Sequence, residues 1–487
     1  MPEAGSAEHA VERLVERVDV VVVGGGITGL SAAFYVQKQS PTCRVVMLEE
    51  SDRVGGKIAS AHIAGTTVDC GPDAFLARVE GAVELANDVG LGDELIAPAT
   101  GKAWLWTRGK LRAFPDGLVL GAPTKVLAIA RSGILSPKGL LRAGLSEILP
   151  TTLTDTADPT VASAIGKHLG REVVDRLVDP LLGGINASDS YRMSLASAAP
   201  NLEAAVRTRY FMRTLRRSQA AASRGAIGSE TKGTEKPIFL TPRTGINTLT
   251  TRVAEQLGDV VRCNQKVTDI HRNINGSWVV ASDSHTWEAP QVILATPAAV
   301  TARLVHELSR HAADLLSGIR TSSVALVLLA YPRSKVHLPA GSGLLVPRAE
   351  GKLMTASSWW NQKWPHLDTK DHVLIRASAG RDGDTRFMDL SDQQLVDQLH
   401  SELAEMVVLD GPPAETFVAR WMSCFPQYDT GHARRVDAIE AALATDAPGL
   451  HLAGASYRGI GIPACIRSAR AAARKVFQAT AVRADRL

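Results

Sequence analysis

The residues best placed to do chemistry in this sequence are glycines and one acid, spaced as in a dinucleotide site. Gly24, Gly26 and Gly29 occupy the glycine positions of a G-x-G-x-x-G turn, and Glu49 follows twenty residues after Gly29. In such a turn the backbone can approach a pyrophosphate, and an acid at this distance accepts hydrogen bonds from a ribose 2′-hydroxyl. The same carboxylate would repel a 2′-phosphate. The spacing therefore predicts a dinucleotide other than NADP.

Two strands and a helix must hold these residues in place. Apolar runs at residues 20–23 and 45–48 predict buried strands that lead into the turn and into the acid. The helix that begins within the turn would direct its unpaired amides and positive dipole end at the phosphates. The cofactor-binding residues predicted in this unit are Gly24, Gly25, Gly26, Ile27, Thr28, Gly29, Glu49 and Glu50.

The residues after this acid narrow the kind of dinucleotide. Residues 53–57 read R-V-G-G-K and complete an E-x-x-x-R-x-G-G-[KR] pattern with Glu49. The segment thereby resembles the superfamily of FAD-dependent amine oxidases and protoporphyrinogen oxidases, which implies FAD as the cofactor and Lys57 as one of the residues that bind it. Arg53 and Lys57 could neutralise phosphate charge or pair with Glu49 and Glu50. A solvated basic turn is the alternative.

Three further blocks resemble the porphyrinogen-oxidising branch of this superfamily. Residues 71–75 read G-P-D-A-F, a turn that lies against the flavin in that branch, and residues 237–300 resemble its second FAD segment. Residues 460–466 read I-G-I-P-A-C-I and open a helix whose N-terminus would point at the isoalloxazine ring. Cys465 could suggest covalent attachment of the flavin, but members of this branch with noncovalent flavin also have a cysteine here, so we expect noncovalent FAD. The resemblance implies further FAD contacts at Gly71, Pro72, Asp73, Ala74, Val267 (through its backbone, to the adenine), Trp421, Ile460, Gly461 and Ile462.

Blocks outside these segments match the same branch in order. Residues 178–188 resemble its [ED]-P-L-[LV]-[SG]-G-[IV]-Y-A-G-D run, with Asn186 in place of Tyr and Ser188 in place of Gly. A helix that ends at Gly183 would account for the glycines alone. His432, in the last matching block, could simply cap a helix. The further matching blocks are residues 341–348, 363–366, 376–381 and 420–432.

This order of blocks is most similar to the soluble coproporphyrinogen III oxidases of Gram-positive bacteria. The resemblance implies oxidation of coproporphyrinogen III to coproporphyrin III in heme biosynthesis, with oxygen as acceptor and hydrogen peroxide as product. The alternatives are protoporphyrinogen IX oxidation, another flavin oxidase of this fold, and a non-enzymatic member of the fold. The sequence shows no Ser/His/Asp set and no metal cluster, so we predict no catalytic acid or base and no metal site.

Composition and charge fit an enzyme with a small anionic substrate. The 54 basic and 50 acidic residues give a net charge of +4, which suits an anionic small molecule and does not call for nucleic acid. Five cysteines without C-x-x-C spacing predict neither disulfides nor a zinc site and favour a cytoplasmic protein. Because we find no secretory signal and no membrane-spanning run, we expect at most peripheral membrane contact. A transient contact with the next enzyme of the heme pathway is a further possible interaction.

At 487 residues the chain exceeds a single ordinary core. We predict an α/β fold with a discontinuous, Rossmann-like FAD-binding domain, a helical insertion and a mixed α+β substrate domain. The basic residues between Arg207 and Lys236 predict a surface loop or a lid over a carboxylate-rich substrate. The expected boundaries are 18–80, 237–300 and 427–487 for the FAD-binding domain, 81–236 for the insertion, and 301–426 for the substrate domain.

Overall fold

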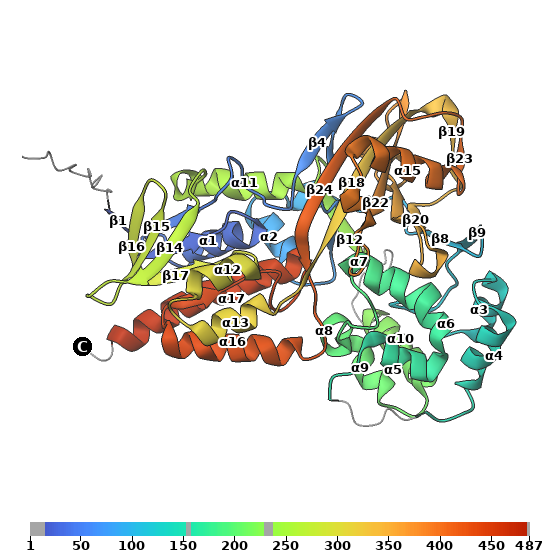
Figure 1. Cartoon of the computed structure of the whole chain (residues 1–487), viewed down its shortest axis with the longest axis horizontal. Coiled ribbons are helices and arrows are strands. Elements are labelled where there is room, and N and C mark those ends of the chain that lie inside the picture. Colours follow the sequence, from blue (N-terminus) through green and yellow to red (C-terminus); the bar gives the residue numbers. More distant parts are fainter. Residues whose placement is uncertain (1–14, 152–156, 228–236, 485–487) are drawn as a thin grey trace, which may run out of the picture.

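The computed structural model describes residues 15–151, 157–227 and 237–484, and a five-stranded parallel sheet lies in one half of the molecule (Figure 1). Every pair of neighbouring strands in this sheet is parallel. Such a sheet is stable only with both faces covered, which explains why β2 and β3 are buried along their whole length. The order of its strands is β13 (Val261–Arg262), β3 (Val45–Leu48), β2 (Val20–Val23), β17 (Gln291–Leu294) and β25 (Leu450–Leu452).

Helices from both ends of the chain cover one face of this sheet. α1 (Ile27–Gln39) and α17 (Ile462–Ala484) pack along each other, and α2 (Ala82–Asp88) and α11 (Asn247–Leu257) join the same core. Alanines at positions 32 and 33 of α1 and at 469, 472 and 473 of α17 are buried, and their small size lets the two helices lie close. The first turns of both helices lie together, because Cys465 of α17 forms a hydrogen bond with Thr28 of α1.

A second sheet and three helices cover the opposite face. This core combines apolar side chains of the parallel sheet with those of the smaller sheet and the helices. The smaller sheet runs in the order β1 (Val15–Arg17), β16 (Thr286–Ala289), β15 (Trp278–Ser282) and β14 (Val267–Arg272). The helices are α12 (Ala298–Val305), α13 (Arg310–Ser317) and α16 (His432–Asp446).

A seven-stranded mixed sheet forms a separate layer, drawn mainly in orange in Figure 1, and α15 (Asp392–Ala404) packs on it. Two of its strands, β8 and β9, form a hairpin that comes from within residues 81–236, and β8 pairs in parallel with β20. The order of the sheet is β24 (Glu415–Pro426), β18 (Thr321–Pro332), β22 (His372–Ala379), β21 (Met354–Trp359), β20 (Gly343–Leu345), β8 (Trp104–Thr107) and β9 (Lys110–Ala113).

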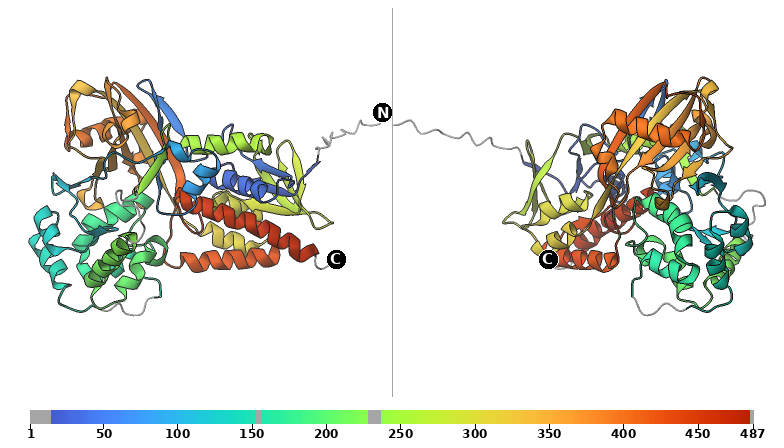
Figure 2. Two further views of the ribbon diagram at one scale, coloured as in Figure 1. Left: turned by 180° about the vertical axis from the view of Figure 1, so that it is seen from behind. Right: turned by 45° about the vertical axis from the view of Figure 1, so that its right-hand side comes forward.

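A mainly helical part lies below this sheet and beside the parallel-sheet part, as the views in Figure 2 show. It has its own apolar core and includes a π-helical segment, η2 (Val174–Gly183), with Pro180 inside it. Its α-helices are α3 (Val126–Ser132), α4 (Pro137–Leu145), α5 (Val161–Leu169), α6 (Arg171–Val173), α7 (Gly184–Asn186), α8 (Leu195–Ala198), α9 (Pro200–Val206) and α10 (Phe211–Ile227).

Short strand pairings connect these parts. β4 (Ser60–Ile63) pairs with β5 (Thr66–Asp69), and β12 (Phe239–Pro242) lies between β6 (Phe75–Leu76) and β7 (Leu95–Ile96). Within the described residues, none of the helices combines the length and the apolar character that crossing a bilayer requires.

Candidate functional site

The glycine-rich turn between β2 and α1 leaves open space at the start of the helix. A Cβ on Gly26, the residue before α1, would meet no other described atom within 4 Å. Among the residues that the structure describes, no side chain caps this end of α1, and the buried Ile27 and Thr28 of its first turn are not acids. A Cβ on Gly29, in contrast, would lie 1.7 Å from the carbonyl oxygen of Gly24. Close packing thus requires Gly29, and the uncapped amides of α1 face a space that an anion can occupy.

Glu49 stands at the carboxyl end of β3, directly beside this turn. Its Oε2 accepts a hydrogen bond of 2.6 Å from the amide of Gly25. Its Oε1 accepts bonds of 2.9 and 2.7 Å from the amide and the hydroxyl of Ser51. The carboxylate is therefore fixed at the edge of the turn, whereas the neighbouring Glu50 is exposed.

The double glycine that follows braces the turn from its other side. Gly55 forms an isolated parallel bridge with Gly26. Gly56 has a φ of +57°, and a Cβ on it would lie 3.3 Å from the Cα of Gly26. The guanidinium of Arg53 donates to three backbone carbonyl oxygens of the same turn, at 3.2, 3.3 and 2.9 Å. Arg53 therefore supports this backbone and does not pair with Glu49.

Lys57 lies where distant parts of the chain meet. Its side chain is accessible to solvent yet surrounded by protein, and this partial loss of hydration lowers the pKa of Lys57. The ionisable side chains near it are the thiols of Cys424 in β24 and Cys465 in α17, whose pKa values burial raises, and no carboxylate among the described residues pairs with it. Burial raises the pKa of Cys465, which also forms a hydrogen bond with Thr28. The first turns of α1 and α17 thus meet at Cys465, with Lys57 beside them.

The turn after β5 is fastened to the seven-stranded sheet. Arg376 of β22 donates to the carbonyl oxygen of Gly71 at 2.7 Å. The carboxylate of Asp73 pairs with Lys363 at 2.6 Å and with Arg376 at 3.3 Å, and it accepts a bond of 3.1 Å from the indole of Trp364. Burial alone raises the pKa of Asp73, but Lys363 and Arg376 outweigh burial and hold the pKa below its usual range. The Asp73 carboxylate is therefore engaged with three donors.

The remaining predicted residues lie at three places. Trp421 of β24 donates from its indole to the carbonyl oxygen of Cys70 at 2.8 Å and so reaches the turn that contains Pro72 and Ala74. Val267 opens β14, two residues after Gln265, whose amide donates to the carbonyl oxygen of Glu49 at 2.8 Å. Ile460, Gly461 and Ile462 lead into α17 just ahead of Cys465.

Some side chains that hold these segments together were not among the predicted site residues. Lys363 and Arg376 belong to blocks that were recognised in the sequence, but nothing there tied them to Asp73. Tyr428 belongs to another such block, and its hydroxyl contacts the backbone just before α17. The sequence signal for these residues is that each is a polar side chain inside a recognised block. The sequence does not show which distant residue each of them contacts.

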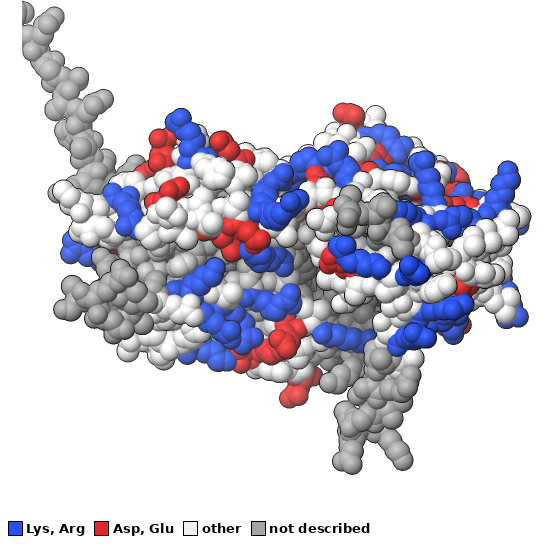
Figure 3. Space-filling model, turned by 90° about the horizontal axis from the view of Figure 1, so that it is seen from below, with Lys and Arg blue, Asp and Glu red and all other residues white. Residues whose placement is uncertain are grey.

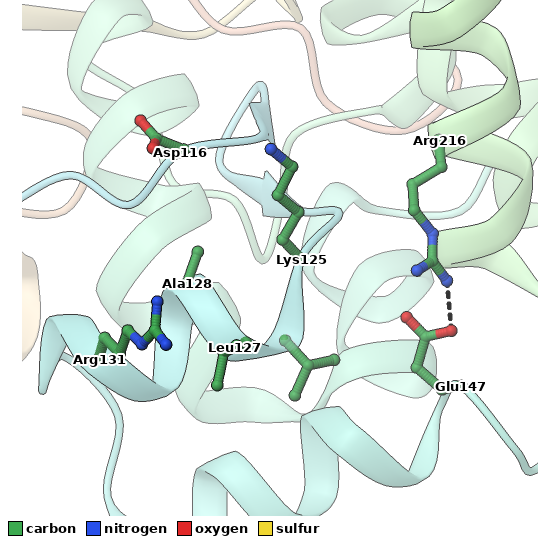
Figure 4. A pocket seen from close by; sticks show the side chains of 8 residues that line it. Asp116, Lys125, Leu127, Ala128, Arg131, Glu147 and Arg216 are labelled. Carbon is green, nitrogen blue, oxygen red and sulfur yellow. Dashed lines mark hydrogen bonds and ion pairs between the residues drawn. The ribbon is translucent and has the colours of Figure 1, made fainter.

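A cavity of about 590 Å³ opens on the helical part, between α3 and α10 (Figure 4). Lys125, Arg131 and Arg216 bring positive charge to it, and Arg216 pairs with Glu147. It includes no residue of the glycine-rich turn. Of the basic segment predicted as a loop or lid, residues 211–227 form α10, and residues 228–236 lie outside the described part of the chain.

Together these features fit an extended anionic dinucleotide. The open space at Gly26 and the uncapped amides of α1 suit phosphates, and the preset carboxylate of Glu49 suits a ribose. The ammonium of Lys57 adds positive charge where α1 and α17 meet.

Comparison with known proteins agrees with this geometry. The family described as flavin containing amine oxidoreductase matches residues 27–477. The chain is 34% identical over 459 residues to the coproporphyrinogen III oxidase of Bacillus subtilis (strain 168), covering 93% of this chain and 96% of that protein. The coproporphyrinogen III oxidase of Staphylococcus aureus (strain NCTC 8325 / PS 47) is 31% identical over 473 residues, covering 94% and 98%.

A solved structure shares the fold over almost the whole chain. It is that of a protein from Exiguobacterium sp. 255-15 described as a protoporphyrinogen oxidase, with a TM-score of 0.82 and 27% identity over 95% of this chain and 99% of that one. These comparisons confirm the predicted α/β fold class and the predicted cofactor, FAD. The chain belongs to the flavin-containing amine oxidoreductase family.

Proposed function

We propose that this chain oxidises coproporphyrinogen III to coproporphyrin III with FAD, as a step of heme biosynthesis. The observation that carries the proposal is the nearly full-length similarity to two bacterial proteins of that name, at 34% and 31% identity. The substrate must lose six hydrogens. In three two-electron oxidations, six electrons and six protons pass to three oxygen molecules, which become three molecules of hydrogen peroxide.

The chain's own residues would bind and orient the cofactor. The amides at the start of α1 would face the phosphates, Glu49 the ribose, and the amides at the start of α17 the isoalloxazine ring. Bound FAD would supply the acceptor for a hydride from a substrate carbon. The protein would position the macrocycle, exclude water and stabilise developing negative charge, with Lys57 as the nearby cation. We assign no acid or base among the described side chains.

We propose that residues 18–80, 237–300 and 427–487 form the FAD-binding domain, 81–236 an insertion, and 301–426 the substrate domain. Support comes from the parallel sheet, which draws strands from all three segments of the first group. The hairpin of β8 and β9 pairs with the seven-stranded sheet, so the insertion also supplies two strands to the substrate side.

Charge and thiol chemistry support an anionic substrate and a cytoplasmic location. Basic side chains cover more of the face in Figure 3 than acidic ones, which favours a substrate with several carboxylates. All five cysteines are free thiols, as expected in a reducing compartment.

An aerobic assay with two porphyrinogens tests the proposed function. Product fluorescence would follow coproporphyrin and protoporphyrin formation in parallel reactions, and peroxide release would be measured with each substrate and with benzylamine. Faster coproporphyrin formation supports the proposal. Faster protoporphyrin formation favours the alternative suggested by the description of the Exiguobacterium protein. Peroxide from benzylamine alone, or no turnover of any substrate, overturns it.

A further inference from the structure

Two aromatic side chains hold the backbone just before α17 at alternate residues. The hydroxyl of Tyr428 donates to the carbonyl oxygen of Ala455 at 2.7 Å and accepts from the amide of Gly459 at 2.7 Å. Nε2 of His432 lies 2.8 Å from the carbonyl oxygen of Tyr457. Because a carbonyl oxygen can only accept, Nε2 must carry the proton. The two rings thus hold three alternate residues, 455, 457 and 459, through their backbone.

The two rings also fix each other. Their centroids are 3.9 Å apart with an angle of 14° between the planes, and Tyr428 and His432 are only 7% and 2% exposed. Burial raises the pKa of Tyr428 and lowers the pKa of His432, so both rings are neutral near pH 7. The pair therefore forms one rigid, uncharged block.

The segment held by this block packs directly against the first turn of α17. Gly459 has a φ of +133°, and a Cβ on it would lie 2.5 Å from the Cβ of Ala464. The amide of Cys465 bonds to the carbonyl oxygen of Gly461 at 3.0 Å, which closes the first helical turn. A displacement of the Tyr428 hydroxyl would thus move the start of α17.

The block itself is anchored to the other two parts of the molecule. The carbonyl oxygen of Tyr428 accepts a bond of 2.8 Å from the amide of Ser194 in the helical part. The next residue, Asp429, accepts two bonds of 2.9 Å from Arg320, which also binds Asp382 at the end of the seven-stranded sheet. The backbone at Tyr428 and Asp429 is therefore anchored by Ser194 and Arg320, while the Tyr428 hydroxyl holds the segment before α17.

We propose that Tyr428 and His432 are positioning residues that fix the N-terminus of α17 against the isoalloxazine ring and so set the reduction potential of the flavin. The inference rests on the proposed function, in which this helix end faces the ring. A helix N-terminus stabilises negative charge only within about its first turn, so a small displacement weakens the effect. The reduced flavin, which carries more negative charge than the oxidised form, loses more stabilisation.

Tyr428→Phe tests this proposal because it keeps the stacked ring and removes both hydroxyl bonds. We expect FAD to bind the apoprotein about tenfold more weakly, as measured by flavin fluorescence quenching. We also expect a more negative midpoint potential in dye-equilibration titrations and a shifted visible flavin band. The matched control is Tyr331→Phe, since Tyr331 is a buried tyrosine of β18 whose hydroxyl lies 2.9 Å from Nδ1 of His400 in α15. That variant should keep the potential and spectrum of the parent protein.

A second variant keeps the inference testable if Tyr428→Phe does not fold. His432→Phe keeps a stacked ring and removes the donor to Tyr457, and it should lower the potential in the same direction. An unchanged potential and spectrum in either folded, FAD-loaded variant overturns the proposal, as does failure of both variants to fold while Tyr331→Phe folds. Absence of FAD binding in the parent protein would instead refute the proposed function.

Discussion

The carboxylate of Glu49 and the amide of Gly25 are joined by a hydrogen bond of 2.6 Å, although 24 residues separate them in the chain. A Cβ on Gly25 would lie 2.7 Å from the Cβ of Glu49, so only glycine leaves room for the carboxylate at the edge of the turn. Ser51 binds the other oxygen of the same carboxylate. The acid is thus already oriented in the absence of a cofactor, which would reduce the entropy lost if Glu49 binds the ribose as proposed.

Gly25→Ala should therefore weaken FAD binding by displacing Glu49. We expect the dissociation constant of FAD to rise about tenfold, because one charge-assisted hydrogen bond loses its geometry. Titration of the apoprotein with FAD measures it. Gly101→Ala is the control, since a Cβ at Gly101 would meet no atom of the described residues within 4 Å. Equal affinities in the two variants would contradict this role of Gly25.

Gly26→Ala tests whether the space beside Gly26 serves cofactor binding or the stability of the fold. A Cβ at Gly26 meets no other described atom within 4 Å, so the apoprotein should unfold at the same temperature as the parent. The added methyl group would occupy the space assigned to the phosphates, and FAD affinity should fall by about tenfold or more. Calorimetry of the apoprotein and FAD titration test the two parts. A lower melting temperature with unchanged affinity would show that the space serves the fold.

Features that depend on neighbouring residues could be predicted from the sequence, whereas contacts between distant segments could not. The turn from Gly24 to Gly29 and the acid after β3 follow from spacing within one βαβ unit, where strand, helix and dipole act on neighbouring residues. The partners of Asp73 do not, because Lys363 lies 290 residues away and only folding of the seven-stranded sheet brings it close. The hairpin of β8 and β9 was recognised from alternation, but its pairing with β20 depends on register between strands far apart in sequence.

Tyr428 illustrates the same limit at the site. Its sequence block was visible, yet a phenol that bonds two backbone groups of another segment leaves no mark in spacing or composition. Arg53 shows the converse, because its charge suggested phosphate or carboxylate partners, and the structure gives it three carbonyl oxygens. The choice among partners of a cation depends on distances that only the folded chain defines.

Asp73→Asn should lower the stability of the protein markedly. The side chains of Asp73, Lys363 and Arg376 are only 13%, 18% and 13% exposed, so the substitution leaves two poorly solvated cations without their anion. We expect the free energy of unfolding to fall by about 3 kcal/mol, measured by urea unfolding of the apoprotein. The control Asp437→Asn removes an exposed partner of Arg458 and should change it little. Similar losses of unfolding free energy in both variants would show that the poorly exposed ion pairs of Asp73 stabilise the protein no more than an exposed pair does.

Asp69 should make stability depend on pH below neutrality. Its carboxyl accepts bonds of 3.0 and 3.4 Å from the amides of Ile246 and Asn247 at the start of α11, yet burial raises its pKa from 3.8 to about 7. Between these values the unfolded chain has released the proton that the folded protein still holds. The contribution of Asp69 to stability is therefore complete below about pH 4 and is lost as the pH rises through about 7.

Asp69→Asn isolates this contribution because an amide does not titrate in that range. The melting temperature of the parent minus that of the variant should decline steadily from pH 4 to pH 7. Above pH 7 it should stay constant, since Asp69 is then ionised in both the folded and the unfolded protein. Differential scanning calorimetry of the two apoproteins across this range gives the difference directly. A difference that stays constant or rises over this range would mean that the two amides of α11 stabilise the carboxylate at least as much as burial destabilises it, so that the carboxyl of the folded protein is already ionised at pH 4.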